Sequence, residues 1–483
     1  MSKHGVYVYE EGTAITAPIV SAAGVQVVIG TAPINMVDDP SAVVNVPILA
    51  NSAQEAMEKL GYLPDFQNYT LCQTMYVTNN MFPVGPVVYI NVLDPATHKT
   101  AVSEAEYSVS NMQAKVTVKG MLRANLVVKS GSTQLTADTD FTTAFDEEGN
   151  MIITLIAGGA GASATTLKVS GNKIDPSAVT ASAVIGAYNP STGAETGMEV
   201  IRQVYPKLGV VPGLLLAPGY SQTSAVGIAL AAKAANINGV FKAMAILDLD
   251  TGSGHATKYT DCLTEKNTAG YTSPYSYVVW PMYKVGEYKF AASAVVAALI
   301  AYTDANNEDV PSISPSNESL PITGTCLTDG TEVILDQDQG STVNGYGVAT
   351  AINMNGFKQW GNYTGAYPSS SDPKDVWLPV RRMFNWQGNN FILVYFEKVD
   401  DPMNAILIES IVDSENIRCA AYAPKHWAGA SIEYLEADNP AEDILAGKMT
   451  FRQKIAPYTP AQEINNILTY DTDLLESVLV GGE

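Results

Sequence analysis

The sequence is poor in the residues from which metal centres, disulfide frameworks and many catalytic sites are built. Its 483 residues include four cysteines and four histidines, and the cysteines form no Cys-x-x-Cys pair. The spacing therefore predicts reduced, buried thiols, with neither a disulfide scaffold nor a metal site. Glycine pairs such as Gly158-Gly159 match neither the Walker A nor the dinucleotide-binding pattern, so we expect no cofactor.

Charge and long hydrophobic runs are also scarce. Charged residues make up 16% of the chain, and 27 basic against 49 acidic residues give a net charge of −22. This balance argues against nucleic acid and against anionic membranes, since both require a basic face. The longest apolar run, 291–302, is too short to span a bilayer. No signal peptide precedes Met1, so we expect the chain to fold in the cytoplasm.

Apolar, β-prone segments are present at both ends of the chain. Termini are normally frayed and polar, and an unpaired apolar strand is a liability. We therefore expect both ends to pair with neighbouring copies, which makes the chain a polymer subunit. The predicted strand-exchange residues are Val6, Tyr7, Val8, Tyr9, Ile464, Ile467, Leu468 and Tyr470.

The pattern along the chain predicts an α/β core interrupted by an all-β module. After an N-terminal arm (1–20), residues 21–100 read as strand, helix, helix, strand. Short alternating runs separated by turn residues then predict an inserted sandwich over 101–190, whose last run is 179–185. The α/β pattern returns over 191–355. Its predicted elements are strands at 211–217, 240–247 and 277–280, and helices at 222–235 and 290–301.

The last part of the chain, 356–483, predicts an α+β C-terminal domain with a terminal strand arm. An amphipathic helix is expected over 402–421, and residues 391–396 fit either a helix or a strand. Strands are expected at 377–382, 448–452 and 464–470.

One constellation invites a hydrolase interpretation. Asp248 ends a predicted strand, His255 follows seven residues later, and the helix over 291–297 resembles the serine-bearing helix of subtilisin-like proteases. That family requires Gly-Thr-Ser at the start of this helix, where this chain has Tyr288-Lys289-Phe290-Ala291, and it requires a His-Gly-Thr-His string that is absent. We therefore predict no catalytic residues and no enzyme activity.

Basic residues gather late in this acidic chain. Arg418 and Lys425 lie near the end of the predicted amphipathic helix. They fit either a face that docks an acidic partner or cations that complement the dipole of a helix C-terminus.

The order of these segments resembles the tail sheath proteins of contractile-tailed bacteriophages and phage-like injection systems. The resemblance covers essentially the whole chain. One departure is the loop at 304–308, which is more acidic and polar than the family pattern. The motifs that carry the resemblance are Ile29-Gly30-Thr31-Ala32-Pro33, Pro218-Gly219-Tyr220-Ser221, Ser314-Pro315-Ser316-Asn317, Trp360-Gly361-Asn362-Tyr363-Thr364 and Arg381-Arg382.

The resemblance implies a subtilisin-like but non-catalytic α/β core. It implies a structural subunit that polymerises helically around a tail tube and contracts to drive the tube through a cell envelope. Its partners would be further copies of itself, the tube protein, and baseplate and tail terminator proteins, without nucleic acid or membrane insertion. It would reside in a virion tail or a phage-like injection particle assembled in a bacterial cytoplasm. Arg418 and Lys425 would face the tube.

Two other functions stay open. The chain could be another structural subunit of a phage particle, such as a tube or capsid protein. A subtilisin-like hydrolase is the more distant alternative.

Overall fold

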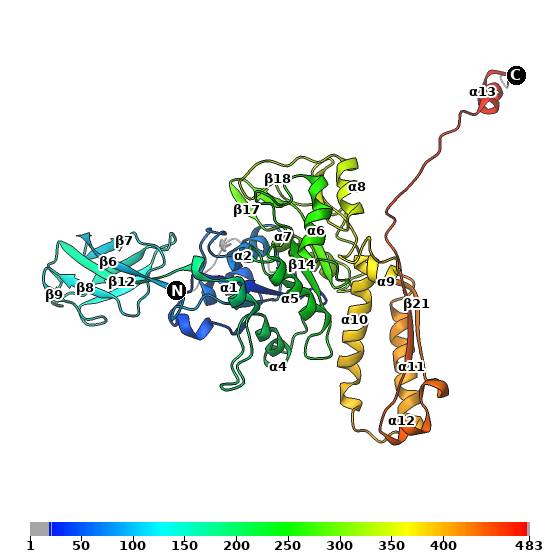
Figure 1. The fold of residues 1–483 in the computed structure, drawn as a ribbon, viewed down its shortest axis with the longest axis horizontal. Helices are drawn as coiled ribbons and strands as arrows, with labels where there is room; N and C mark the ends of the chain where they lie inside the picture. Colours follow the sequence, from blue (N-terminus) through cyan, green and yellow to red (C-terminus); the bar gives the residue numbers. More distant parts are fainter. Residues whose placement is uncertain (1–18, 21, 481–483) are drawn as a thin grey trace, which may run out of the picture.

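The structure is a computed structural model that describes residues 19, 20 and 22–480. A central α/β body carries a β domain at one end and a helical C-terminal domain at the other, and a tail leaves the C-terminal domain (Figure 1). The predicted strand residues Val6, Tyr7, Val8 and Tyr9 lie outside the described residues.

The body is built on a six-stranded sheet in the order β15-β14-β13-β2-β5-β3. All neighbouring strands are parallel except β3, which runs antiparallel to β5. Helices cover the sheet, which explains why its strands read as continuous apolar runs. The strands are β2 (Gln26–Gly30), β3 (Pro47–Ala50), β5 (Val87–Asn91), β13 (Leu214–Leu216), β14 (Met244–Asp248) and β15 (Ser276–Val279).

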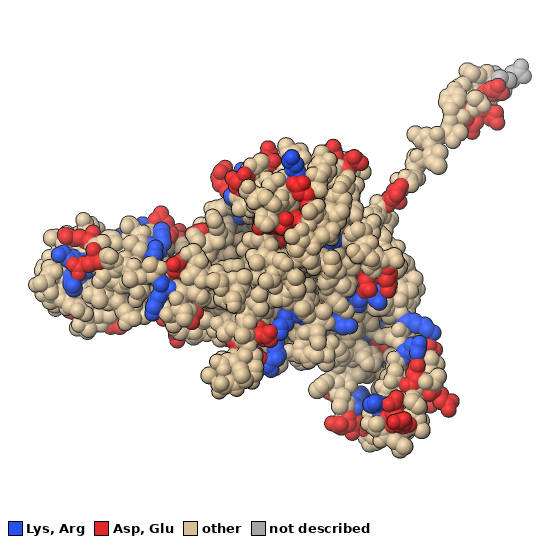
Figure 2. Space-filling view, in the orientation of Figure 1, with Lys and Arg blue, Asp and Glu red and all other residues tan. Residues whose placement is uncertain are grey.

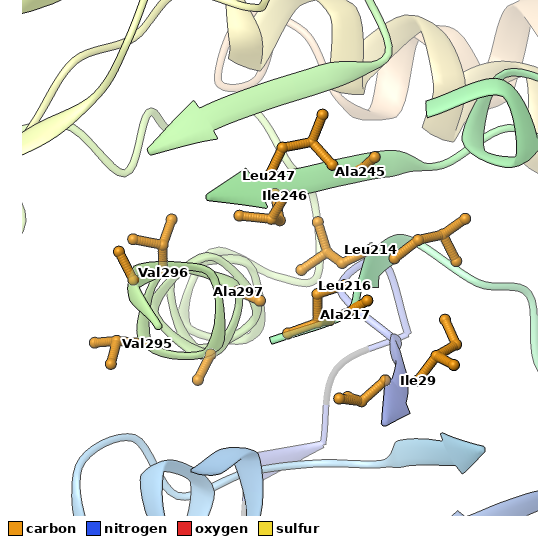
Figure 3. Close-up of a cluster of buried hydrophobic side chains, with 14 of the residues drawn as sticks. Ile29, Leu214, Leu216, Ala217, Ala245, Ile246, Leu247, Val295, Val296 and Ala297 are labelled. Atoms are coloured by element: carbon orange, nitrogen blue, oxygen red, sulfur yellow. The ribbon is translucent and has the colours of Figure 1, made fainter. Parts of the chain in front are cut away.

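The most deeply buried helix is α7 (Ala292–Asn306), in which every residue from Ala292 to Ala301 is buried. Its side chains Val295, Val296 and Ala297 lie beside residues of β13 and β14 (Figure 3). This burial is why the segment is apolar on all sides. The other body helices are α1 (Ala53–Leu60), α2 (Leu71–Asn80), α3 (Ala181–Ile185), α4 (Val204–Leu208), α5 (Ser224–Ala235), α6 (Cys262–Ala269) and α8 (Gln337–Gly345).

Local sequence explains where α1 begins and ends. The Ser52 hydroxyl accepts a hydrogen bond from the Glu55 N–H at 3.2 Å, and Gly61 ends the helix with a φ of 76°. A serine cap and a glycine stop are the signals expected at these positions.

Smaller sheets complete the body, and one of them crosses a predicted domain boundary. Strands β19 and β20 form an antiparallel hairpin, so the expected division between 355 and 356 falls inside it. The strands of these small sheets are β1 (Ile19–Val20), β4 (Val84–Gly85), β16 (Met282–Val285), β17 (Tyr288–Phe290), β18 (Gly324–Cys326), β19 (Thr350–Asn353) and β20 (Phe357–Trp360).

The inserted domain runs from β6 (Lys99–Ser110) to β12 (Thr166–Ile174) and has a core of its own. Its seven strands form one hydrogen-bonded sheet in the order β10-β11-β7-β6-β12-β8-β9, and both halves of this sheet contribute to the same apolar cluster. The run at 179–185, predicted as a strand, is instead the helix α3, whose Val184 is buried in the body. The remaining strands are β7 (Gln113–Val116), β8 (Val127–Ser130), β9 (Thr133–Gln134), β10 (Phe141–Phe145) and β11 (Met151–Leu155).

The C-terminal domain consists of two long helices and a β-hairpin. Residues 377–382, predicted as a strand, instead begin α10, with Pro379 in the first turn, where its missing N–H costs nothing. Because residues 391–396 continue or directly follow that helix, their strand alternative is wrong. The elements are α9 (Pro373–Val376), α10 (Leu378–Tyr395), α11 (Ala405–Ala421), β21 (Trp427–Glu433), α12 (Ala441–Leu445), β22 (Arg452–Pro457) and α13 (Thr472–Val480).

Two predicted closing strands differ from the structure. The strand expected at 448–452 begins at Arg452, because the residues before it close a loop in which Asn439 bonds Thr450. The segment 464–470 is not a strand in this single chain, and no strand of the described residues pairs with it. None of the described helices combines the length and apolar character needed to cross a membrane.

Candidate assembly site

The tail, defined here as residues 458–480, projects from the molecule with its apolar side chains in solvent (Figure 1). Gln462 still touches the body, since its amide oxygen accepts a hydrogen bond from the Tyr363 hydroxyl at 2.6 Å. Beyond it, the four predicted exchange residues are 76–89% exposed. A run of exposed apolar side chains marks an interaction site. These residues are Ile464, Ile467, Leu468 and Tyr470.

The tail starts from a hairpin whose two strands pair only with each other. Strands β21 and β22 are antiparallel, with Ser431 opposite Lys454 and Glu433 opposite Arg452. A two-stranded sheet is marginal by itself. The Asn416 side chain bonds the backbone N–H and C=O of Ile432 on β21, whereas the outer edge of β22 has no backbone partner among the described residues. The hairpin therefore has hydrogen-bonding capacity for further strands.

A buried carboxylate joins the hairpin to both long helices. Glu415 of α11 is completely buried. It accepts hydrogen bonds from Gln387 of α10 at 2.6 Å and from Gln453 of β22 at 2.8 Å. Burial opposes ionisation of this group, but the hydrogen bonds and charge of Arg418, with the two amides, outweigh it and lower the pKa of Glu415. The carboxylate thus fixes the geometry of the hairpin on its helices.

The two predicted tube-facing cations both have partners within the chain. Arg418 donates to Glu415 at 2.5 and 2.9 Å and to Gln387 at 2.7 Å, and its side chain is only 19% exposed. Lys425 is more exposed and pairs with Glu308 at 2.6 Å. Arg418 therefore makes its contacts inside the C-terminal domain, whereas the charge of Lys425 lies at the surface. Their orientation toward a tube stays a prediction.

The last turn of α7 and the loop that follows it link three parts of the molecule. Asp304 forms a buried ion pair with Arg382 of α10. Asp309 accepts hydrogen bonds from the Ala22 and Ala23 N–H groups at 2.8–3.1 Å, directly after β1. Glu308 also contacts the buried His426 at 3.2 Å. The polar composition of this loop, which departs from the family pattern, provides these contacts between the N-terminal segment, the body and the C-terminal domain.

The residues of the hydrolase interpretation do not form a triad. Asp248 accepts hydrogen bonds from the Ser221 hydroxyl at 2.8 Å and from the Ser293 hydroxyl at 2.6 Å. Burial raises the pKa of Asp248. His255 instead contacts Glu265 at 3.1 Å and Asp250 at 3.6 Å. Because Asp248 also accepts from the Ser293 N–H in the first turn of α7, it caps that helix.

The sequence interpretation missed α13, although a signal for it is present. Leu474, Leu475, Val478 and Leu479 are spaced to lie on one helical face. The Asp471 carboxylate accepts hydrogen bonds from the N–H groups of Asp473 and Leu474, at 2.9 and 3.1 Å. An acidic cap followed by that spacing predicts a short amphipathic helix.

The exposed apolar tail and the two-stranded hairpin fit the class of proteins that assemble with other chains. The comparisons give that class a family. No protein-family model matches the chain. The tail sheath protein of Burkholderia phage BcepMu is 27% identical over 99% of this chain and 98% of its own length. The tail sheath protein of Escherichia phage P2 is 25% identical over 59% of this chain and 70% of its own length.

Solved structures share the fold. A contracted sheath complex of the extracellular contractile injection system PVC superposes with a TM-score of 0.57 at 15% identity, covering 98% of this chain and 99% of that chain. The contracted helical sheath of the anti-feeding prophage gives 0.56, also at 15% identity, covering 98% of this chain and all of that one. Sequence likeness along the whole chain, together with this shared fold, identifies the chain as a member of the contractile tail sheath proteins, and its function is that of a structural sheath subunit.

Proposed function

We propose that this chain polymerises into a helical sheath around a tail tube, and that the tails of neighbouring copies hold the polymer together. The observation that carries the proposal is the exposed apolar segment from Ile464 to Tyr470. Head-to-tail contacts between identical chains generate open helices. The sheath would form part of a virion tail or of a phage-like injection particle, together with tube, baseplate and terminator proteins, and we propose no catalytic role.

The tail of one copy would add a strand to the β21–β22 hairpin of another copy by β-augmentation. The open edge of β22 offers backbone hydrogen bonds, and Glu415 fixes the hairpin to its helices. Pairing would bury the side chains of Ile464, Ile467 and Leu468 that are now in solvent. In the N-terminal arm, Val6, Tyr7, Val8 and Tyr9 would form the second exchanged strand, since Ile19 and Val20 pair with β4 of their own chain.

Contraction would follow from rigid-body movement of subunits that stay joined by these strands. The extended lattice would be kinetically trapped by its tube and baseplate contacts, and triggering would release it into a better-packed lattice. Contraction would release about a few kcal/mol of free energy per copy, which is small compared with the stability of one domain but adds up along the polymer.

Electron microscopy of the purified full-length chain tests the proposal, because sheath subunits of this kind would form hollow cylinders. Ile467→Pro removes a backbone donor from the exchanged strand, and Ile467→Val retains it. We expect cylinders from the wild type and from Ile467→Val, but folded monomers from Ile467→Pro and from the chain lacking residues 1–20. Cylinders from Ile467→Pro at the wild-type yield would contradict exchange of the C-terminal strand, and normal cylinders from the shortened chain would contradict exchange of the arm.

A further inference from the structure

The helix α13 has an apolar face that is exposed, with none of the described residues covering it. Its side chains Leu474, Leu475, Val478 and Leu479 are 47–78% exposed. A nine-residue helix is too short to be stable alone in water, so its stability must come from packing of its apolar face. The polar face carries Asp473, Glu476 and Ser477, and residues 471–479 contain no cation. The helix therefore requires an apolar groove on another surface.

A groove of about 490 Å³ lies between the body and α10 of the C-terminal domain. One wall comes from the body, with Val25, Val210, Val211 and Met244, and the other comes from the C-terminal domain. Its carboxylates are engaged by the chain itself, Glu308 by Lys425 and His426 and Asp309 by backbone N–H groups. The residues on the C-terminal-domain wall are Asn385, Trp386, Asn389, Asn390, Leu393 and Tyr422.

The groove also offers positive charge for an acidic helix. Lys242 is exposed at the groove and has no ion pair among the described residues, although its ammonium lies 5.8 Å from the ring centre of Tyr275. The other cation, Arg382, is held by Asp304. Lys242 is therefore available to an occupant that, like α13, carries only acidic charges.

The groove shares an aromatic cluster with the hairpin proposed to accept the exchanged strand. Trp386 and Tyr422 line the groove and also pack edge-to-face on each other and on Trp427 of β21, with ring centres 5.0–6.2 Å apart. In the tail, only Asp471 separates Tyr470 from the start of α13. One extended residue spans about 3.3 Å. If Ile464–Tyr470 pairs with the hairpin, α13 therefore lies within a few ångströms of the end of that strand, on an adjoining surface.

We propose that α13 of a second copy docks in this groove, with its apolar face against Trp386, Leu393 and Tyr422 and its acidic face toward Lys242. This inference rests on the proposed strand exchange and adds a separate contact to it. An occupied groove would contact the body and the C-terminal domain at once, so each tail would fix the relative position of the two domains in the copy that receives it.

Site-directed crosslinking tests the contact in full-length chains. The four native cysteines are buried, so introduced cysteines on the surface are the reactive ones. Val478→Cys on α13 is mixed with a second chain carrying Leu393→Cys in the groove, and a short bismaleimide is added. The control partner is Leu445→Cys, which is 89% exposed on α12. We expect a crosslinked dimer with Leu393→Cys at several times the yield of the control. Equal yields would overturn the proposal, and so would predominant crosslinking within a chain that carries both Val478→Cys and Leu393→Cys.

A matched pair of charge insertions separates this contact from strand exchange. Leu475→Glu and Ser477→Glu each add one negative charge to α13, on the apolar and the polar face respectively. We expect Leu475→Glu to abolish the specific crosslink and to raise the subunit concentration needed for cylinders at least tenfold, whereas Ser477→Glu changes neither. If Ile467→Pro blocks assembly and Leu475→Glu changes neither the crosslink nor assembly, strand exchange stands and the helix contact is wrong. If no variant or wild-type chain forms cylinders, the proposed function fails, and the crosslink yield still decides the helix contact.

Discussion

Removing the Glu415 carboxylate is expected to release the hairpin from its two helices. The variant Glu415→Ala leaves the Arg418 guanidinium without its ion-pair partner in a site where that side chain is only 19% exposed. It also deprives the Gln387 and Gln453 amides and the Tyr395 hydroxyl of an acceptor. Breaking a buried pair costs about 3–5 kcal/mol, and the partial exposure of Arg418 favours the lower end, about 3 kcal/mol. Glu415→Gln keeps the shape and one acceptor, so we expect about 1.5 kcal/mol.

Hydrogen exchange followed by mass spectrometry measures this loss of stability in the C-terminal domain itself. A chain of several domains does not unfold in one step, so a global midpoint would mix the domains. Local opening of α11 reports the C-terminal domain alone. A loss of about 3 kcal/mol is roughly a hundredfold faster exchange of α11 amides. Glu409→Ala removes an exposed carboxylate from the same helix and is the control, with an expected effect within about 0.5 kcal/mol.

The pH dependence of α11 protection tests the same role of Glu415, and the direction of the pKa shift predicts how protection changes with pH. The pKa of Glu415 is lowered in the folded chain from its ordinary value of 4.5. Its contribution is therefore fully present above pH 4.5 and is lost as the pH falls through the lower, folded value. Protection of α11 should fall on acidification in the wild type more steeply than in Glu415→Gln. A loss under about 1 kcal/mol for Glu415→Ala, or identical acid profiles, would refute the role of this carboxylate.

Two further predictions concern the charges around the groove. Arg382→Met leaves Asp304 buried without its ion-pair partner and should lower stability by about 3–5 kcal/mol, whereas the double variant Arg382→Met with Asp304→Leu should recover most of that loss, measured by hydrogen exchange of the α10 amides. Reversing the surface charge with Lys425→Glu should weaken assembly on tubes, measured as sheathed tube length by electron microscopy. Glu308→Lys alone is the control for loss of their ion pair, and unchanged sheathing by Lys425→Glu would reject the tube-facing placement.

Local signals in the sequence predicted much of the body but less of the C-terminal domain. Serine and glycine caps place α1 correctly, and buried apolar runs identify β2 and β5, because these features act within a few residues of the chain. The strand expected at 377–382 is wrong because its apolar residues fit a strand as well as the first turns of α10, and packing decided between them. The segment 464–470 is not a strand in the single chain, and the strand proposed to pair with it would belong to another copy.

The sequence also assigned Arg418 and Lys425 a common role that the structure divides. Both are cations near the end of one helix, and nothing local distinguishes them. Arg418 lies three residues from Glu415 and forms an ion pair with it. Gln387, which is 31 residues away in sequence, bonds Arg418, and Gln453, which is 35 residues away, bonds Glu415 in the same buried network. Lys425 lies beyond the helix and meets Glu308 at the surface. Long-range contacts of this kind cannot be inferred from spacing.

The length of the tail bears on how such a polymer can rearrange without coming apart. The 13 residues from Tyr458 to Tyr470 span up to about 43 Å when extended. A strand held on a neighbouring hairpin, with a helix seated beside it, is a local contact that does not depend on how the two bodies face each other. Tyr458 and Gln462 are hydrogen-bonded to their own chain, so release of these two contacts would free the residues before Ile464 to act as a tether that absorbs changes in the relative position of the bodies. Contacts between bodies would then be replaced by other contacts, while the proposed strand and helix contacts would keep every subunit joined to its neighbours throughout contraction.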